Sequence, residues 1–138
     1  MATEHEMEIE AVTSNLMEVL GFVDSYLEKI DCPMKVQMQI EIAVEEIFTN
    51  IANYAYAPKI GRAKIRVEAA SSDSAVKITF TYRGVPYDPL AKEDPDITLS
   101  AEERAIGGLG IFMVKKSMED MHYEYKDGQN ILTIEKKL

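Results

Sequence analysis

The chain has 138 residues, of which 46% are hydrophobic and 28% charged, and its formal net charge is −9. This length and balance are typical of one soluble domain with its own core. The acidic surface argues against nucleic acid or an anionic membrane as a partner, because both need clustered Lys and Arg. The sequence has no apolar run of about 18 residues and no basic secretory start, so we expect a cytoplasmic protein.

The first half of the chain predicts a strand followed by two helices. Residues 5–10 alternate apolar residues with glutamates, which indicates a short edge strand. Residues 14–30 and 36–56 repeat apolar residues at helical spacing, and the second helix should end before Pro58.

The next segments predict a hairpin and then a long loop. Residues 63–69 and 75–82 alternate apolar and polar side chains around a short polar turn, which indicates two paired strands. Residues 83–108 follow no period and are rich in Pro, Gly and acids. A loop of this length in a small domain is usually a functional lid or a disordered linker.

The last part of the chain predicts one more helix and one more hairpin. The helix covers residues 109–119, and the strands cover residues 121–126 and 130–136. The whole order indicates a single α+β domain over residues 1–138, in which helices cover one face of a mostly antiparallel sheet.

The second predicted helix carries a polar stripe beside its apolar one. Glu46, Asn50 and Asn53 share one side of the helix, since residues three and four apart are neighbours. A carboxylate can act as a base toward an incoming hydroxyl, and an amide oxygen is a hard ligand for Mg²⁺. Taken alone, such a pair is more often a solvated face.

Two glycine-containing segments add to this pattern. Gly84 follows a strand and would allow a base or the main chain to approach closely, and Asp88 precedes Pro89 in a non-helical position. The ordinary alternative for this segment is a strand-ending turn.

The segment from Gly107 to Gly110 opens a helix, where free backbone amides and the helix dipole favour an anion. It is neither a Walker A loop nor a Rossmann fingerprint.

Together these segments resemble the GHKL (Bergerat-fold) ATP-binding domains, in particular bacterial anti-sigma factor serine kinases. Glu46-xxx-Asn50 resembles their N box, Gly84-Val-Pro-Tyr-Asp-Pro-Leu the end of their G1 box, and Gly107-Gly-Leu-Gly-Ile their G2 box. The segment from Tyr123 to Thr133 resembles their terminal hairpin. The resemblance implies a Bergerat-type two-layer sandwich, with a mixed, mostly antiparallel sheet covered on one face by about three helices.

The resemblance also implies roles in phosphoryl transfer. Glu46 would be the general base, and Asn50 would hold Mg²⁺ between the phosphates of ATP. Asn53 would bond a phosphate or the ribose. Arg104 would steady the γ-phosphate or the partner protein, within an ATP lid over residues 88–107.

Other implied roles concern the nucleotide. Gly84 would lie under the adenine, and Thr133 matches a threonine that helps to hold it. The backbone amides that would hold the phosphates belong to three glycines: Gly107, Gly108 and Gly110.

One departure from the family pattern concerns the adenine. The G1 box normally has an aspartate two residues before its glycine, where it accepts a hydrogen bond from the adenine amino group, but here the residue is Tyr82. Tyr82 lies on the apolar side of its strand and could simply fill the core. Asp88 would compensate only if its loop folded back.

The leading prediction is an ATP-dependent serine/threonine protein kinase that phosphorylates a small antagonist protein and binds a sigma factor, acting by analogy as a homodimer. A histidine kinase would need a dimerisation helix pair and a phosphoacceptor segment. A gyrase- or chaperone-type ATPase would need further domains. The alternative of another class is a non-catalytic regulatory module with weak or lost nucleotide binding, which the residue Tyr82 favours.

Overall fold

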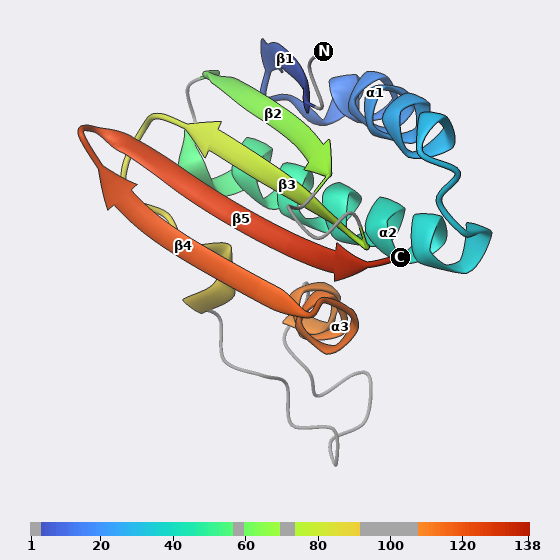
Figure 1. The fold of residues 1–138 in the computed structure, drawn as a ribbon. Coiled ribbons are helices and arrows are strands. Elements are labelled where there is room, and N and C mark those ends of the chain that lie inside the picture. Colours follow the sequence, from blue (N-terminus) through green and yellow to red (C-terminus); the bar gives the residue numbers. More distant parts are fainter. Residues whose placement is uncertain (1–3, 57–59, 70–73, 92–107) are drawn as a thin grey trace.

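The structure is a computed structural model that describes residues 4–56, 60–69, 74–91 and 108–138. Figure 1 shows a sheet with helices packed against it. The strands are β1 (Glu4–Glu10), β2 (Arg62–Ala69), β3 (Ala75–Tyr82), β4 (Asp120–Lys126) and β5 (Gln129–Lys137). The α-helices are α1 (Leu16–Lys29), α2 (Met34–Asn50) and α3 (Gly108–Ser117). Short helical turns are η1 (Thr13–Asn15), η2 (Ile51–Ala55) and η3 (Pro89–Ala91).

The five strands form one sheet in the order β1-β2-β3-β5-β4. All four pairings between them are antiparallel, which confirms the predicted α+β class. The sheet is therefore antiparallel throughout the described residues rather than mixed. The hairpins β2–β3 and β4–β5 have connections too short for the crossover that parallel neighbours require.

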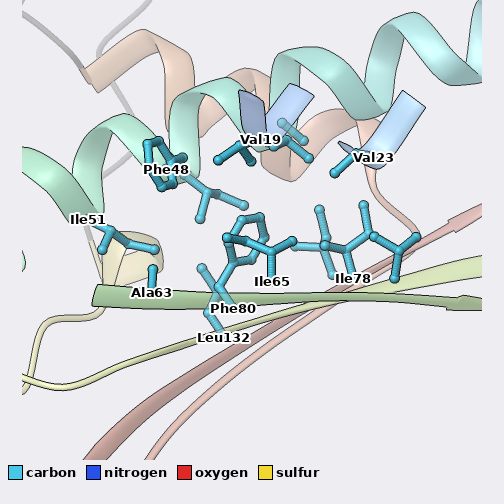
Figure 2. Packing of buried hydrophobic residues seen from close by; sticks show 14 of the residues in the cluster. Val19, Val23, Phe48, Ile51, Ala63, Ile65, Ile78, Phe80 and Leu132 are labelled. Carbon is cyan, nitrogen blue, oxygen red and sulfur yellow. The ribbon is translucent and has the colours of Figure 1, made fainter. Parts of the chain in front are cut away.

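The core lies between the helices and one face of the sheet, as Figure 2 shows. Alternate residues of the strands, such as Ile65, Ile78 and Leu132, point into this layer and are buried. Val19 from α1 and Phe48 from α2 meet them from the helix side. Each large apolar side chain buried in this way stabilises the fold by about 1.5–3 kcal/mol, so the apolar stripe of α2 fixes how the helix is rotated.

Helix α3 is attached to the sheet at its C-terminal end. The Lys136 ammonium donates a hydrogen bond to the Ser117 carbonyl at 2.6 Å, and the Glu119 amide donates to the Glu135 carbonyl at 3.0 Å. The helix also packs against α2. Its N-terminal turn is thereby placed beside the polar stripe of α2.

The predicted helix over residues 36–56 is not regular to its end. After Asn50 the α-helical pattern gives way to a π-helical turn, η2, over Ile51–Ala55. Such wide turns are rare in proteins, and those that occur are often found at functional sites.

Candidate functional site

Glu46 and Asn50, the acid and the amide predicted on α2, are directly hydrogen-bonded to each other. The Asn50 side chain is 4% exposed, and its Nδ2 donates to the Glu46 carbonyl at 2.7 Å and to Glu46 Oε1 at 3.0 Å. The spacing of four residues on one helix produces this contact. Both acceptors need an NH₂ group, so the amide is oriented with its oxygen directed elsewhere.

The carboxylate of Glu46 lies against Gly110 in the first turn of α3. A Cβ atom at Gly110 would lie 2.2 Å from the Glu46 carboxyl carbon and 2.3 and 2.4 Å from its oxygens. Only glycine can admit the carboxylate in this place. A helix N-terminus also favours negative charge, because its first amides have no partner within the helix. The structure therefore brings the acid and amide of α2 together with the glycine-rich start of α3.

Tyr87 reaches the same place from the loop after β3, a contact that no pattern in the sequence predicts. Its hydroxyl donates a hydrogen bond to Asn50 Oδ1 at 3.1 Å. Its ring lies beside the ring of Tyr54, with centroids 5.8 Å apart. Burial, and then the neighbouring Tyr54, Glu46 and Asp88, raise the pKa of Tyr87 to about 12. The hydroxyl is therefore a neutral donor at physiological pH.

Asn130 on β5 is the polar centre of this region. It is 0% exposed, and its Nδ2 donates to the carbonyls of Tyr82 and Val85, each at 3.1 Å. Its Oδ1 accepts from the Tyr87 amide at 2.8 Å and from the Tyr123 hydroxyl. Both donors and both lone pairs are used, so this one side chain fixes the loop that follows β3. In the sequence it reads as an ordinary polar residue after a turn.

Tyr82 is part of the core, which was one of the two predicted possibilities. Its side chain is 1% exposed, and its hydroxyl donates to the Tyr87 carbonyl at 2.6 Å. Burial raises the pKa of Tyr82, so the group stays protonated. The residue at the family's aspartate position thus holds the loop and presents no carboxylate to an adenine amino group.

Gly84 and Asp88 serve the local backbone. Gly84 has φ +104°, and a Cβ atom there would lie 2.7 Å from the Ala55 carbonyl oxygen. Glycine is therefore required by the main chain that passes close by. Asp88 Oδ1 accepts a hydrogen bond from the Leu90 amide at 2.8 Å and so caps the short turn η3.

The remaining predicted residues are placed as follows. Asn53 is exposed within η2, and Gly108 begins α3. Arg104 and Gly107 lie outside the described residues, as does the part of the predicted lid over residues 92–107.

Thr133 does not belong to this site. It lies on β5 between Leu132 and Ile134, which are both buried under the helices, so its side chain points to the opposite face of the sheet. There it lines a hollow of about 270 Å³. The prediction was wrong because a motif match does not fix the alternation of a strand, and the residue of β5 that reaches the site is Asn130. A larger hollow of about 450 Å³, lined by residues such as Lys64 and Arg83, is also away from Glu46 and Asn50.

The side chains at the site fit a magnesium–phosphate group better than they fit adenine. No three His, Cys, Asp or Glu residues converge to hold a metal in the described part of the chain. A cation would therefore rely on the Asn50 oxygen and on phosphate oxygens, a donor set that suits Mg²⁺. Gly110 has no side chain and admits the Glu46 carboxylate beside the helix start, whereas the polar groups of Tyr82 and Asn130 already bond within the protein.

None of the helices within the described ranges is long and apolar enough to span a membrane.

Comparisons with known proteins show which family this chain resembles. Residues 9–136 match the histidine kinase-like ATPase domain. Serine/threonine-protein kinase BtrW from Bordetella bronchiseptica is 20% identical over 128 residues, which cover 93% of this chain and 89% of BtrW. Serine-protein kinase RsbW from Bacillus cereus is 26% identical over 100 residues, which cover 67% of this chain and 59% of RsbW. The chain thus spans less than two thirds of that relative.

A solved structure shows the same fold. The RsbU and RsbW domains of Rv1364c from Mycobacterium tuberculosis superpose with a TM-score of 0.67 at 14% identity, covering 99% of this chain and 32% of that one. Because the family match extends over nearly the whole chain and the solved structure has the same layered arrangement, the chain belongs to the histidine kinase-like ATPase domain family.

Proposed function

We propose that this chain is an ATP-dependent serine/threonine protein kinase of the anti-sigma type. The observation that carries the proposal is the position of the Glu46 carboxylate, which is bonded to Asn50 and lies against Gly110 at the start of α3. A base, a metal-ligating oxygen and an anion-binding helix start are the parts that phosphoryl transfer to a hydroxyl requires.

Each part has a distinct task in this proposal. Glu46 accepts the proton of the incoming serine or threonine hydroxyl. Asn50 offers Oδ1 to Mg²⁺, and the backbone amides of Gly108 and Gly110 face the phosphates, together with Gly107. When bound, Mg²⁺ neutralises the phosphate charge. Asn53, Asp88 and Arg104 remain candidates for nucleotide contacts, as does the lid over residues 88–107.

The partners in this proposal are a small antagonist protein and a sigma factor, and the chain acts in the cytoplasm as a homodimer. The names of the relatives, which are serine or serine/threonine kinases, support the protein substrate. The net charge of −9 supports protein partners over nucleic acid.

Thermal unfolding with and without Mg-ATP tests nucleotide binding. Ligand at about a hundred times its dissociation constant should stabilise the fold by about 2.7 kcal/mol, which raises the unfolding midpoint by several degrees. Millimolar Mg-ATP that leaves the midpoint unchanged would exclude the kinase.

Glu46→Gln tests the catalytic step. This variant should still bind Mg-ATP but lose roughly a hundred- to ten-thousandfold in phosphate transfer to a candidate antagonist protein. Glu45→Gln is the matched control, because Glu45 is an exposed neighbour on the same helix, and it should transfer at the normal rate. Equal rates for the two variants would show that Glu46 is not the base.

A second candidate function is a regulatory module that binds protein partners but little or no nucleotide. The observation that favours it is that Tyr82 and Asn130 use their polar groups to hold the loop rather than to read a base. The module predicts no stabilisation by Mg-ATP, so the same unfolding experiment separates the two functions.

A further inference from the structure

The oxygen that the proposed function assigns to a metal already accepts a hydrogen bond within the protein. Asn50 Oδ1 accepts the hydrogen bond of the Tyr87 hydroxyl at 3.1 Å, while Nδ2 of the same amide donates to Glu46. Asn50 is almost fully buried, at 4% exposure. Both ends of its amide are therefore engaged within the protein.

The position of the Tyr87 hydroxyl is set by the fold. The backbone amide of Tyr87 donates to Asn130 at 2.8 Å, and its carbonyl accepts from Tyr82 at 2.6 Å. Both partners are buried in the core, at 0% and 1% exposure for Asn130 and Tyr82. The ring also lies beside Tyr54. With its backbone held on both sides, Tyr87 can withdraw its hydroxyl mainly by turning its side chain.

A hydroxyl donor and a small divalent cation compete for the same oxygen. Mg²⁺ approaches its ligands to about 2.0–2.1 Å and demands near-octahedral geometry. The hydroxyl proton points at the amide oxygen, so its positive end would face the cation at short range. The hydroxyl uses one of the two lone pairs of the amide oxygen, so a cation on the other lone pair is repelled by the hydroxyl dipole and binds more tightly once the hydroxyl has turned away.

We propose that Tyr87 is a positioning residue of the metal site, whose hydroxyl caps Asn50 Oδ1 in the nucleotide-free protein and is displaced when Mg²⁺ enters with a nucleotide. This inference rests on the proposed function, because it takes Asn50 as the metal ligand. It adds a gate at a residue of the segment after β3 to which the resemblance assigns no role. The gate belongs to the loop after β3, which Asn130 and Tyr82 tie to the sheet, so the metal end of the site is coupled to that loop.

The test compares nucleotide affinity with and without the metal. Isothermal titration with a non-hydrolysable ATP analogue, in excess Mg²⁺ and in excess EDTA, gives the factor by which Mg²⁺ tightens binding. Tyr87→Phe removes only the hydroxyl and should raise this factor by roughly two- to tenfold, the equivalent of one neutral hydrogen bond. Binding in EDTA should be unchanged. Tyr125→Phe is the matched control, since Tyr125 is 44% exposed on β4, and its factor should equal that of the wild type.

The outcomes separate the gate from the function beneath it. An unchanged or smaller factor in Tyr87→Phe overturns the gate, because it means that the hydroxyl is neutral toward the metal or helps to hold it, while nucleotide binding stands. Failure of all three proteins to bind the analogue overturns the proposed function and the gate with it. A second measurement uses the wild type alone. Adding Mg²⁺ to the analogue complex should produce a tyrosine ultraviolet difference spectrum, and its absence would contradict displacement of the hydroxyl.

Discussion

Replacing Gly110 by alanine should displace the Glu46 carboxylate without unfolding α3. The new methyl carbon would lie 2.2 Å from the carboxyl carbon, whereas ordinary contact begins at 3.4 Å, so the carboxylate must retreat by about 1.2 Å (3.4 minus 2.2). The carboxylate is the far end of a flexible side chain, so it can move at little cost in strain. Its hydrogen bond from Asn50, 3.0 Å long, should be lost.

Two opposing effects set the size of the change. Loss of a hydrogen bond to a charged group destabilises the fold by about 1.5–3 kcal/mol. Alanine in place of glycine within a helix stabilises it by up to about 1 kcal/mol. The free energy of unfolding should therefore fall by about 0.5–3 kcal/mol.

Urea unfolding of a double-mutant cycle checks this reasoning. In the Glu46→Ala background the methyl meets no carboxylate, so Gly110→Ala should be neutral or stabilising. Gly21→Ala on α1 is the control for helix propensity alone, because a Cβ atom there would meet nothing within 4 Å. If Gly110→Ala destabilises equally with and without the Glu46 carboxylate, the methyl is obstructed by something other than this carboxylate.

Three further predictions concern residues around the site and the helices. The hydrogen bond with Asp24, followed by burial and by repulsion from the same group, raises the pKa of Glu41 from 4.5 to about 7. Because the folded chain holds this proton more tightly, the stabilisation is fully present below pH 4.5 and is lost as the pH rises through about 7. The stabilisation amounts to about 1 kcal/mol after solvent screening. Glu41→Gln should remove this pH dependence of the free energy of unfolding, measured with urea. Identical pH profiles for the wild type and Glu41→Gln would contradict the prediction. Asn130→Ala leaves four hydrogen-bond partners of this buried side chain unpaired and should destabilise the fold by about 3–5 kcal/mol, against less than about 0.5 kcal/mol for the exposed Asn53→Ala; similar losses would refute the role of Asn130. Tyr82→Phe should cost about 1–2 kcal/mol, and Tyr82→Asp more, because it buries a carboxylate in the core without tightening ATP binding; tighter binding by the aspartate variant would show that this position does read the base.

The regular elements could be predicted because their apolar residues repeat at the period of one structure. The α2 stripe through Ile40, Val44 and Ile47 and the alternation of β3 both face the core as expected. The contact between Glu46 and Asn50 could also be predicted from the sequence, since residues four apart on a helix are neighbours.

The rest of the site depends on contacts between distant residues, which a period cannot reveal. Tyr87 meets Asn50 across 37 positions of the chain and Asn130 across 43. Tyr87 and Asn130 lie in or beside turns, where polar residues are common for local reasons. Thr133 was misplaced for a related reason, because a shift of one residue along a strand moves a side chain to the other face.

The π-helical turn η2 has a consequence for anyone who transplants this site. Each residue of an α-helix advances the chain by 100° around its axis, so one additional residue in a widened turn changes the direction of everything after it. Tyr54 lies within that turn and reaches the Tyr87 ring from there. A graft that copied Glu46 and Asn50 onto a straight helix would keep the acid and the amide but would direct Tyr54 away from the Tyr87 ring. A graft of this site must therefore include the π-helical turn η2 as well as the residues that the turn orients.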